Sequence, residues 1–175
     1  MNSRLGTRAE VRGRWCAASS VLSADRVLIL AIEFVSGAMD AGELLARVLK
    51  RADALASARS ALEGIHTVLS EDHISGFARA LAADVQLMNH RISICSIGDL
   101  RAYLVTKTTT HWTTEHTFQF IPLDELPQAD VRYRVTHPTV LARTLSVGFR
   151  MAADDYEWEL PTQEYTVLVC SADVH

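Results

Sequence analysis

The stretch CSIGDLRAYLV, residues 95 to 105, places a Gly-Asp pair and an arginine between two apolar runs. A charged side chain inside a buried sheet is costly unless it is paired or ligates something. Gly98 and Asp99 therefore mark either a tight turn or a carboxylate with a chemical role.

Other residues that could do chemistry lie in strand-like or polar segments. His111 and His116 are five residues apart in a strand-like stretch, so their side chains are expected on opposite faces, which disfavours a metal pair. Asp154 and Asp155 lie in a polar stretch that we interpret as a solvated loop without a catalytic role. No Gly-rich phosphate loop, zinc-ligand spacing or basic stripe is present.

Cys95 or Cys170 could act as a nucleophile with His137, but no local signature supports that arrangement. We expect these thiols to be buried and inert. The aromatic residues of the strand-like segments are expected to fill a core rather than to stack on a ligand: Tyr103, Trp112 and Trp158.

Composition limits the classes of protein. The 175 residues suit one domain, 1–175, with residues 1 to 20 as a flexible or edge-covering arm. The net charge of −4 and the pI near 5.9 argue against a nucleic-acid partner. Three separated cysteines suit a reducing compartment, and neither a membrane span nor a secretory signal is found. We expect a cytoplasmic protein that does not bind membranes.

Hydrophobic periodicity predicts strands, then helices, then strands again. Residues 26 to 34 form an apolar strand, and Asp40 is placed to cap a helix with Glu43 three residues on. The helical stretch from 41 to 69 is long, so two packed helices with a break near residues 55 to 59 are favoured.

Beyond Gly76 the period changes to that of strands. The segments FARALAADVQLM and RISICSIG indicate a β-hairpin that turns at Asn89. Further strands are predicted at LRAYLVTK (100 to 107), THWTTEHTFQF (110 to 120), YEWEL (156 to 160) and EYTVLVCS (164 to 171), with a loop over residues 126 to 138. Helices followed by a strand meander predict an α+β or layered αβ fold.

Five segments, in this order along the chain, resemble motifs of the metal-dependent PP2C-type serine/threonine phosphatases. LILAIEFVSGAMDAGELLARVL (28 to 49) is similar to the strand, metal loop and first helix of that family, and ICSIGDLRAYLV (94 to 105) is similar to its VGDSRAYL strand pair. WTTEHTF (112 to 118) resembles the LTEDHS segment, and HPTVLARTLSVG (137 to 148) resembles the loop N-x-L-T-R-A-L-G. YTVLVCSAD (165 to 173) resembles the strand that ends in LLCSDG. The resemblance implies a layered αββα fold: a β-sandwich flanked by helices, here reduced at its N- and C-terminal ends.

In that family, aspartates at strand ends hold two Mg²⁺ or Mn²⁺ ions, and a bridging water attacks phosphoserine or phosphothreonine. The resemblance places Glu33 and Phe34 at the Asp-Gly of the metal loop, where a phenylalanine blocks the close backbone approach that glycine allows. It places Ala172 at another metal-binding aspartate, and Asp173, one residue later, would point to the opposite face. Asp99 matches a carboxylate that serves an auxiliary metal in the family.

Other motifs of the family are missing from this sequence. The first-strand Asn-Glu-Asp and the terminal Asp-Asn have no counterpart, and Arg12 or Arg14 is a poor match to the phosphate-binding arginine. Asp99 is therefore expected to accept N–H groups of the turn or to pair with Arg101, or else to form a residual cation site with Glu33.

These departures imply a pseudophosphatase that has lost catalysis and acts as a protein-binding or regulatory module in phospho-signalling. Its partner would be a kinase or another signalling protein, and no cofactor is expected. The alternative is a divergent, active phosphatase that uses Mg²⁺ or Mn²⁺ with Glu33, Asp99 and Asp173 as ligands. An unrelated αβ scaffold with chance motif matches is the third possibility.

The strand at YTVLVCS carries no charge, and a sheet that ends there would expose an unpaired edge. Such an edge tends to associate. The sequence therefore predicts a homodimer, or a protein partner that adds a strand, unless residues 1 to 20 fold over the edge.

Overall fold

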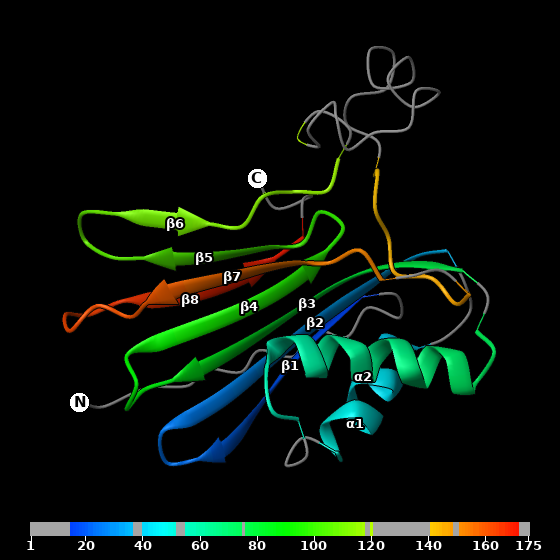
Figure 1. The fold of residues 1–175 in the computed structure, drawn as a ribbon, viewed down its shortest axis with the longest axis horizontal. Coiled ribbons are helices and arrows are strands. Elements are labelled where there is room, and N and C mark those ends of the chain that lie inside the picture. The colour runs from blue at the N-terminus through cyan, green and yellow to red at the C-terminus, as the bar shows by residue number, and fades with distance from the viewer. Residues whose placement is uncertain are drawn as a thin grey trace.

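The computed structural model describes residues 15–36, 40–51, 55–74, 76–117, 120, 141–148 and 151–171. In these ranges the chain forms two helices and two antiparallel sheets (Figure 1). The elements in chain order are β1 (Trp15–Ser23), β2 (Arg26–Ser36), α1 (Ala41–Leu49), α2 (Ala58–Glu71), β3 (Phe77–Gln86), β4 (Arg91–Ile97), β5 (Arg101–Val105), β6 (Thr110–Trp112), β7 (Asp154–Glu159) and β8 (Thr166–Cys170).

The strands of the described residues form a five-stranded sheet in the order β1-β2-β3-β4-β7 and a three-stranded sheet in the order β6-β5-β8. Three pairs of strands form hairpins, β1–β2, β3–β4 and β5–β6, whereas β2 and β3 pair across the segment that holds both helices. The predicted hairpin at Asn89 is confirmed: β3 and β4 pair with Gln86 opposite Arg91, and the Asn89 side chain donates to Gln86 Oε1 at 2.8 Å.

The two predicted helices are also confirmed. The Asp40 side chain caps α1 by accepting from the backbone N–H of Glu43 at 2.9 Å. Ser57 caps α2 in a reciprocal capping box with Ser60, whose side chain accepts from the backbone N–H of Ser57. Because α1 ends at Leu49, the break between the helices begins earlier than the predicted residues 55 to 59.

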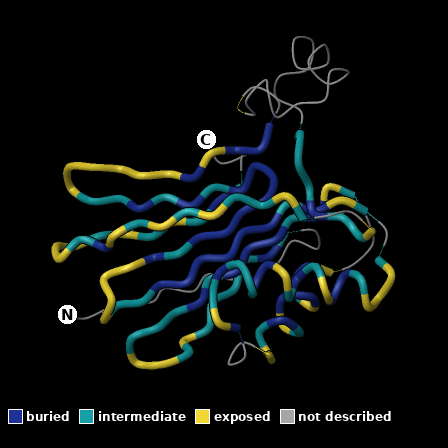
Figure 2. Tube along the Cα trace, in the orientation of Figure 1, coloured by how far each residue is buried: buried dark blue, intermediate teal, exposed yellow. Residues whose placement is uncertain are grey.

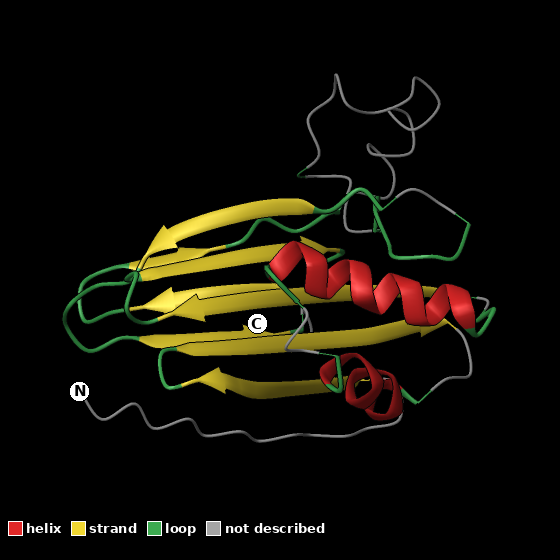
Figure 3. Cartoon of the chain, turned by 60° about the horizontal axis from the view of Figure 1, so that its bottom comes forward, coloured by secondary structure: helices red, strands yellow, loops and turns green. Residues whose placement is uncertain are grey.

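Two apolar layers hold the fold together. Both helices cover one face of the five-stranded sheet, as Figure 3 shows, and bury Leu44, Leu62 and Ile65 against it. A second layer lies between the two sheets and contains Leu81 and Leu104. Burial is concentrated in the central strands, and β6 is exposed along its length (Figure 2).

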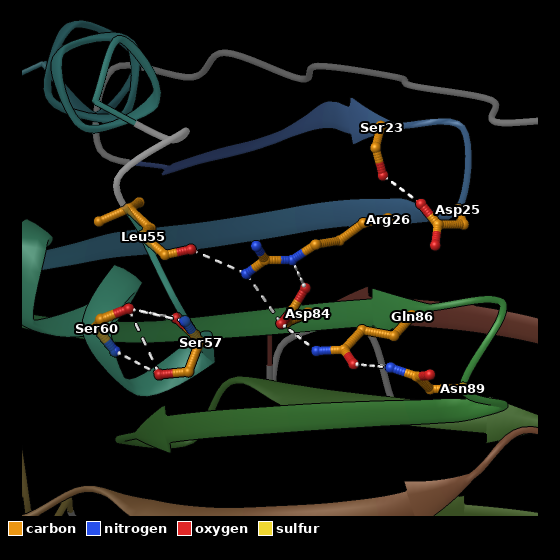
Figure 4. Close-up of polar contacts among 9 residues, drawn as sticks. All are labelled: Ser23, Asp25, Arg26, Leu55, Ser57, Ser60, Asp84, Gln86 and Asn89. Carbon is orange, nitrogen blue, oxygen red and sulfur yellow. Dashed lines mark hydrogen bonds and ion pairs between the residues drawn. The ribbon is translucent and has the colours of Figure 1, made fainter.

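A buried ion pair fastens the sheet to the start of α2 (Figure 4). Asp84 of β3 has only 1% of its side chain exposed, and Arg26 of β2 binds it through Nε at 2.8 Å and Nη2 at 3.1 Å. The same guanidinium donates to the carbonyl of Leu55, and Gln86 donates to Asp84. This network satisfies a carboxylate that burial would otherwise make costly.

The predicted α+β sandwich is confirmed, and three details of the prediction are corrected. Residues 15 to 20, assigned to an arm, form part of β1 and pair with β2. Among the described residues of the predicted strand 110 to 120, a strand forms over Thr110–Trp112, with a further isolated bridge from Thr117 to Leu141. In the part of the chain that the structure describes, the helices flank one sheet only.

The predicted loop at 126 to 138 lies outside the described residues. Neither α1 nor α2 is long and apolar enough to cross a membrane.

Candidate functional site

The candidate site is a cluster of three charged side chains at one end of the five-stranded sheet. Glu33 of β2 lies directly opposite Arg79 of β3 in the strand register. Since Ala80 pairs with Ile97 of β4, Arg79 lies next to Gly98, the residue that follows β4 and precedes Asp99. The register thus brings together two carboxylates that the sequence singled out and an arginine that it did not.

Arg79 donates hydrogen bonds to Asp99 and forms a longer ion pair with Glu33. Its Nη1 lies 2.6 Å from Oδ1 and 2.7 Å from Oδ2 of Asp99, and its Nε lies 3.5 Å from Oε2 of Glu33. The side chains of Glu33, Arg79 and Asp99 are 19%, 15% and 11% exposed, so water screens these charges weakly. The prediction that Asp99 pairs with Arg101 is wrong: a neighbouring strand supplies the cation.

Gly98 makes room for the arginine. Its φ of +98° lies in a region that side chains rarely adopt, and a Cβ at this position would lie 2.5 Å from the Cβ of Arg79. Its amide donates to Nδ1 of His116 at 2.9 Å, and the His116 amide donates to its carbonyl at 2.8 Å. The Gly-Asp pair therefore marks a tight turn whose shape is adapted to Arg79.

Arg101 has a different carboxylate partner, Glu115, and also donates to the hydroxyl of Tyr103 at 3.2 Å. Glu115 is buried, so this pair replaces the local Asp99–Arg101 pair that the sequence suggested. The two arginines serve separate carboxylates on either side of the turn.

A second polar cluster surrounds the buried His116. Its Nε2 lies 2.9 Å from Oδ2 of Asp154, and Arg143 donates to Oδ1 of the same carboxylate at 3.0 Å. His111 lies elsewhere, exposed in β6 with its ring 6.2 Å from that of Trp158. The two histidines do not come together, as the strand period predicted.

The interpretation of Asp154 and Asp155 as a loop is wrong, although both side chains are partly exposed, at 43% and 53%. Both residues begin β7, and Arg59 of α2 binds the Asp155 carboxylate through Nε at 2.9 Å and Nη2 at 2.6 Å. The pair therefore anchors β7 to the helix layer on one side and to His116 on the other.

The cysteines are placed as inert thiols. Cys95 lies in β4 and Cys170 in β8, so they belong to different sheets, and both are buried. Burial, helped by a hydrogen bond with Asp155, raises the pKa of Cys95 to about 12, and burial also raises the pKa of Cys170. A thiol with such a high pKa is a poor nucleophile. His137 lies outside the described residues.

The described residues do not fit a two-metal centre. Glu33 and Asp99 are bound to a guanidinium, and no group of three or more metal-ligating side chains occurs among the residues that the structure describes. Phe34 points the other way and is buried in the helix-facing core. The remaining residues that the resemblance singled out lie outside the described ranges: Arg12, Arg14, Ala172 and Asp173.

Sequence reasoning missed Arg79, although a signal was present. The run FARALAADV is apolar except for Arg79 and Asp84, and a charge within a buried strand requires a partner. Asp84 faces the helices and Arg79 faces the opposite side of the sheet, where Glu33 is its register neighbour.

Comparison with known proteins identifies the fold. The sequence matches no protein-family model and no curated protein. The structure is similar to a bacterial serine phosphatase, with a TM-score of 0.66, 14% identity and coverage of 93% of this chain and 75% of that one. It is also similar to the serine/threonine phosphatase Stp1 from Staphylococcus aureus, with a TM-score of 0.59, 14% identity and coverage of 97% and 78%.

A third similar structure is the Stage II Sporulation E family protein from Thermanaerovibrio acidaminovorans, with a TM-score of 0.62 and 17% identity over 87% of this chain and 76% of that one. The chain therefore has the fold of the PP2C-type serine/threonine phosphatases, as its motifs predicted. At this level of identity the likeness defines the fold alone.

Proposed function

We propose that this chain is a catalytically inactive PP2C-fold domain that acts as a protein-binding module in phospho-signalling, and that it associates with a second copy of itself. The observation that carries the proposal is the outer face of the three-stranded sheet. Both described helices lie on the other sheet, so none of the described elements packs over this face.

The outer face presents a row of large side chains across all three strands. Tyr103 of β5 lies opposite Trp112 of β6 on one side and opposite Leu168 of β8 on the other. Trp112 is 59% exposed and Leu168 is 50% exposed. Exposed apolar side chains gathered on one uncovered face of a sheet support a protein-interaction surface.

The edge strand β8 is suited to self-pairing. It carries no charge, and a two-fold axis at Leu168 would pair Val167 with Val169 and Thr166 with Cys170 of the second copy. Antiparallel pairing of two β8 strands would satisfy the open N–H and C=O groups of the edge and join the two apolar rows. The self-complementary edge favours a second copy over another partner.

The catalytic half of the proposal rests on Arg79, which binds two of the three carboxylates that an active site would use. The fold itself favours the alternative, a divergent Mn²⁺- or Mg²⁺-dependent phosphatase with Glu33, Asp99 and Asp173 as ligands. We also propose a kinase or another signalling protein as a further partner of the domain.

Sedimentation velocity of the full chain at micromolar concentration tests the proposed association. We expect a dimer, and we expect Leu168→Lys to shift it to monomer because two lysines would meet at the two-fold axis. Val21→Lys is the matched control and should leave the dimer intact, since it places the same charge at a 61% exposed apolar residue of β1, in the other sheet. A wild-type protein that stays monomeric, or a dimer that survives Leu168→Lys, would contradict the proposal.

A further inference from the structure

The cluster of Glu33, Arg79 and Asp99 has a charge balance that bears on cation binding. Two carboxylates converge on one guanidinium, and all three side chains are less than one-fifth exposed. Carboxylates brought together in a poorly hydrated place need a positive charge between them, from a metal ion or from a basic side chain. Here the basic side chain is present.

The arginine is held in place by its surroundings. Its backbone is fixed in β3 opposite Glu33, and Gly98 leaves the space that the base of its side chain fills. The contact of one Nη1 with both oxygens of Asp99, at 2.6 and 2.7 Å, uses the two atoms that would ligate a metal. A divalent cation could bind Asp99 only by displacing the guanidinium, which would then be buried without that partner.

We infer that Arg79 is the resident cation of this site: its guanidinium takes the place of a divalent metal ion between Glu33 and Asp99. The arrangement is then independent of metal, and the two carboxylates form a latent site for a hard divalent cation that Arg79 blocks. This inference does not depend on the proposed association, because β8 and Arg79 belong to different sheets.

Titration of the full chain with MnCl₂, by calorimetry and by electron paramagnetic resonance of the free ion, tests the inference. Wild type is expected to show no saturable binding. Arg79→Met removes the charge and keeps the length of the side chain, so it should bind Mn²⁺ at least about tenfold more tightly than wild type does. Arg79→Lys should behave as wild type, and adding Asp99→Asn to Arg79→Met should abolish the gain.

Arg59→Met is the matched control, because among the described residues Arg59 binds one carboxylate, the more exposed one of Asp155, together with the backbone carbonyl of Ala153. It should bind no Mn²⁺ above the wild-type level. Wild type that binds Mn²⁺ as tightly as Arg79→Met does, or a folded Arg79→Met that shows no gain, overturns the inference.

If Arg79→Met does not fold alone, millimolar Mn²⁺ should restore its circular dichroism, and a failure to do so also overturns the inference. The oligomeric state of each variant is measured separately. If Arg79→Met gains no Mn²⁺ affinity while the protein is still a dimer, this inference is refuted and the proposed association stands. If Arg79→Met gains Mn²⁺ affinity while the protein is a monomer, the association alone is refuted.

Discussion

Nη1 of Arg79 lies within 2.7 Å of both carboxylate oxygens of Asp99, so one nitrogen of a β3 side chain closes the turn that follows β4. The pair joins neighbouring strands of the sheet and is largely shielded from water. Its strength should therefore appear in the stability of the whole domain.

Asp99→Asn is expected to lower the free energy of unfolding by about 3 kcal/mol, because it leaves a buried guanidinium with a weaker partner. Urea denaturation with added Mn²⁺ and with a chelator should give the same loss. Asp155→Asn, in a pair that is 38% and 53% exposed, is the control and should cost less than about 1 kcal/mol. A loss at Asp99 that depends on added cation would instead identify that residue as a metal ligand through binding linkage.

Gly98→Ala should destabilise the domain through both backbone strain and a clash. The φ of +98° alone costs a side chain on the order of 1 to 3 kcal/mol, and the new Cβ would meet the Arg79 Cβ. Gly148→Ala is the matched control, because Gly148 also has a positive φ, of +82°, but has nothing within 4 Å of its would-be Cβ. Equal thermal shifts for the two variants would mean that the contact with Arg79 does not contribute.

Hydrolysis of p-nitrophenyl phosphate in Mn²⁺ should not exceed background, because Arg79 binds the carboxylates that a metal would need. The serine/threonine phosphatase Stp1, whose structure is similar, serves as the positive control. Turnover that requires Mn²⁺ and disappears in Asp99→Ala would establish the alternative, an active enzyme.

Arg26→Met should cost about 3 kcal/mol of stability, since Asp84 would lose its charged partner while 1% exposed. Arg91→Met is the control, because its contact with Glu157 lies at the surface and is expected to contribute less than about 1 kcal/mol. Thermal unfolding of both variants checks the difference. Similar unfolding midpoints for the two variants would show that hydrogen bonds from Gln86 and water are enough to stabilise the buried Asp84 carboxylate.

Alkylation of Cys95 should be slow in the native protein at pH 8 and fast in urea, because the neutral thiol predominates far below a pKa of about 12. Because burial raises the pKa of Cys95 from about 9 to about 12, the stability that the neutral thiol contributes is fully present below pH 9 and is lost as the pH rises toward 12. Mass spectrometry of the labelled peptides measures the rates. Rapid native labelling of Cys95 at pH 8 would contradict its burial.

Local patterns predicted the elements better than they predicted the site. The β3–β4 hairpin, the Asp40 cap and the strands β2, β5 and β8 follow from period, turn residues and capping chemistry, all of which are short-range. β1 has no such signal, because its serines and alanines alternate weakly and its pairing depends on β2.

The charged pairs required the register of distant strands. Asp99 and Arg101 are close in sequence, yet each finds a partner on another segment, Arg79 and Glu115. The sequence did not indicate the partners of Asp154, because the residues that bind it, His116 and Arg143, come from other parts of the fold. Such contacts depend on the order of the strands in the sheet, and the hydrophobic periodicity of the sequence does not predict that order.

The late pairing of β7 with β4 and of β8 with β5 has a consequence for synthesis on the ribosome. Both partner strands, β4 and β5, are translated well before residues 154 to 170 appear. Until then the nascent chain holds two strands with open edges, one of them the apolar Arg91–Ile97. This is the interval in which the chain would depend most on chaperones, and a ribosome that pauses before β7 would prolong it.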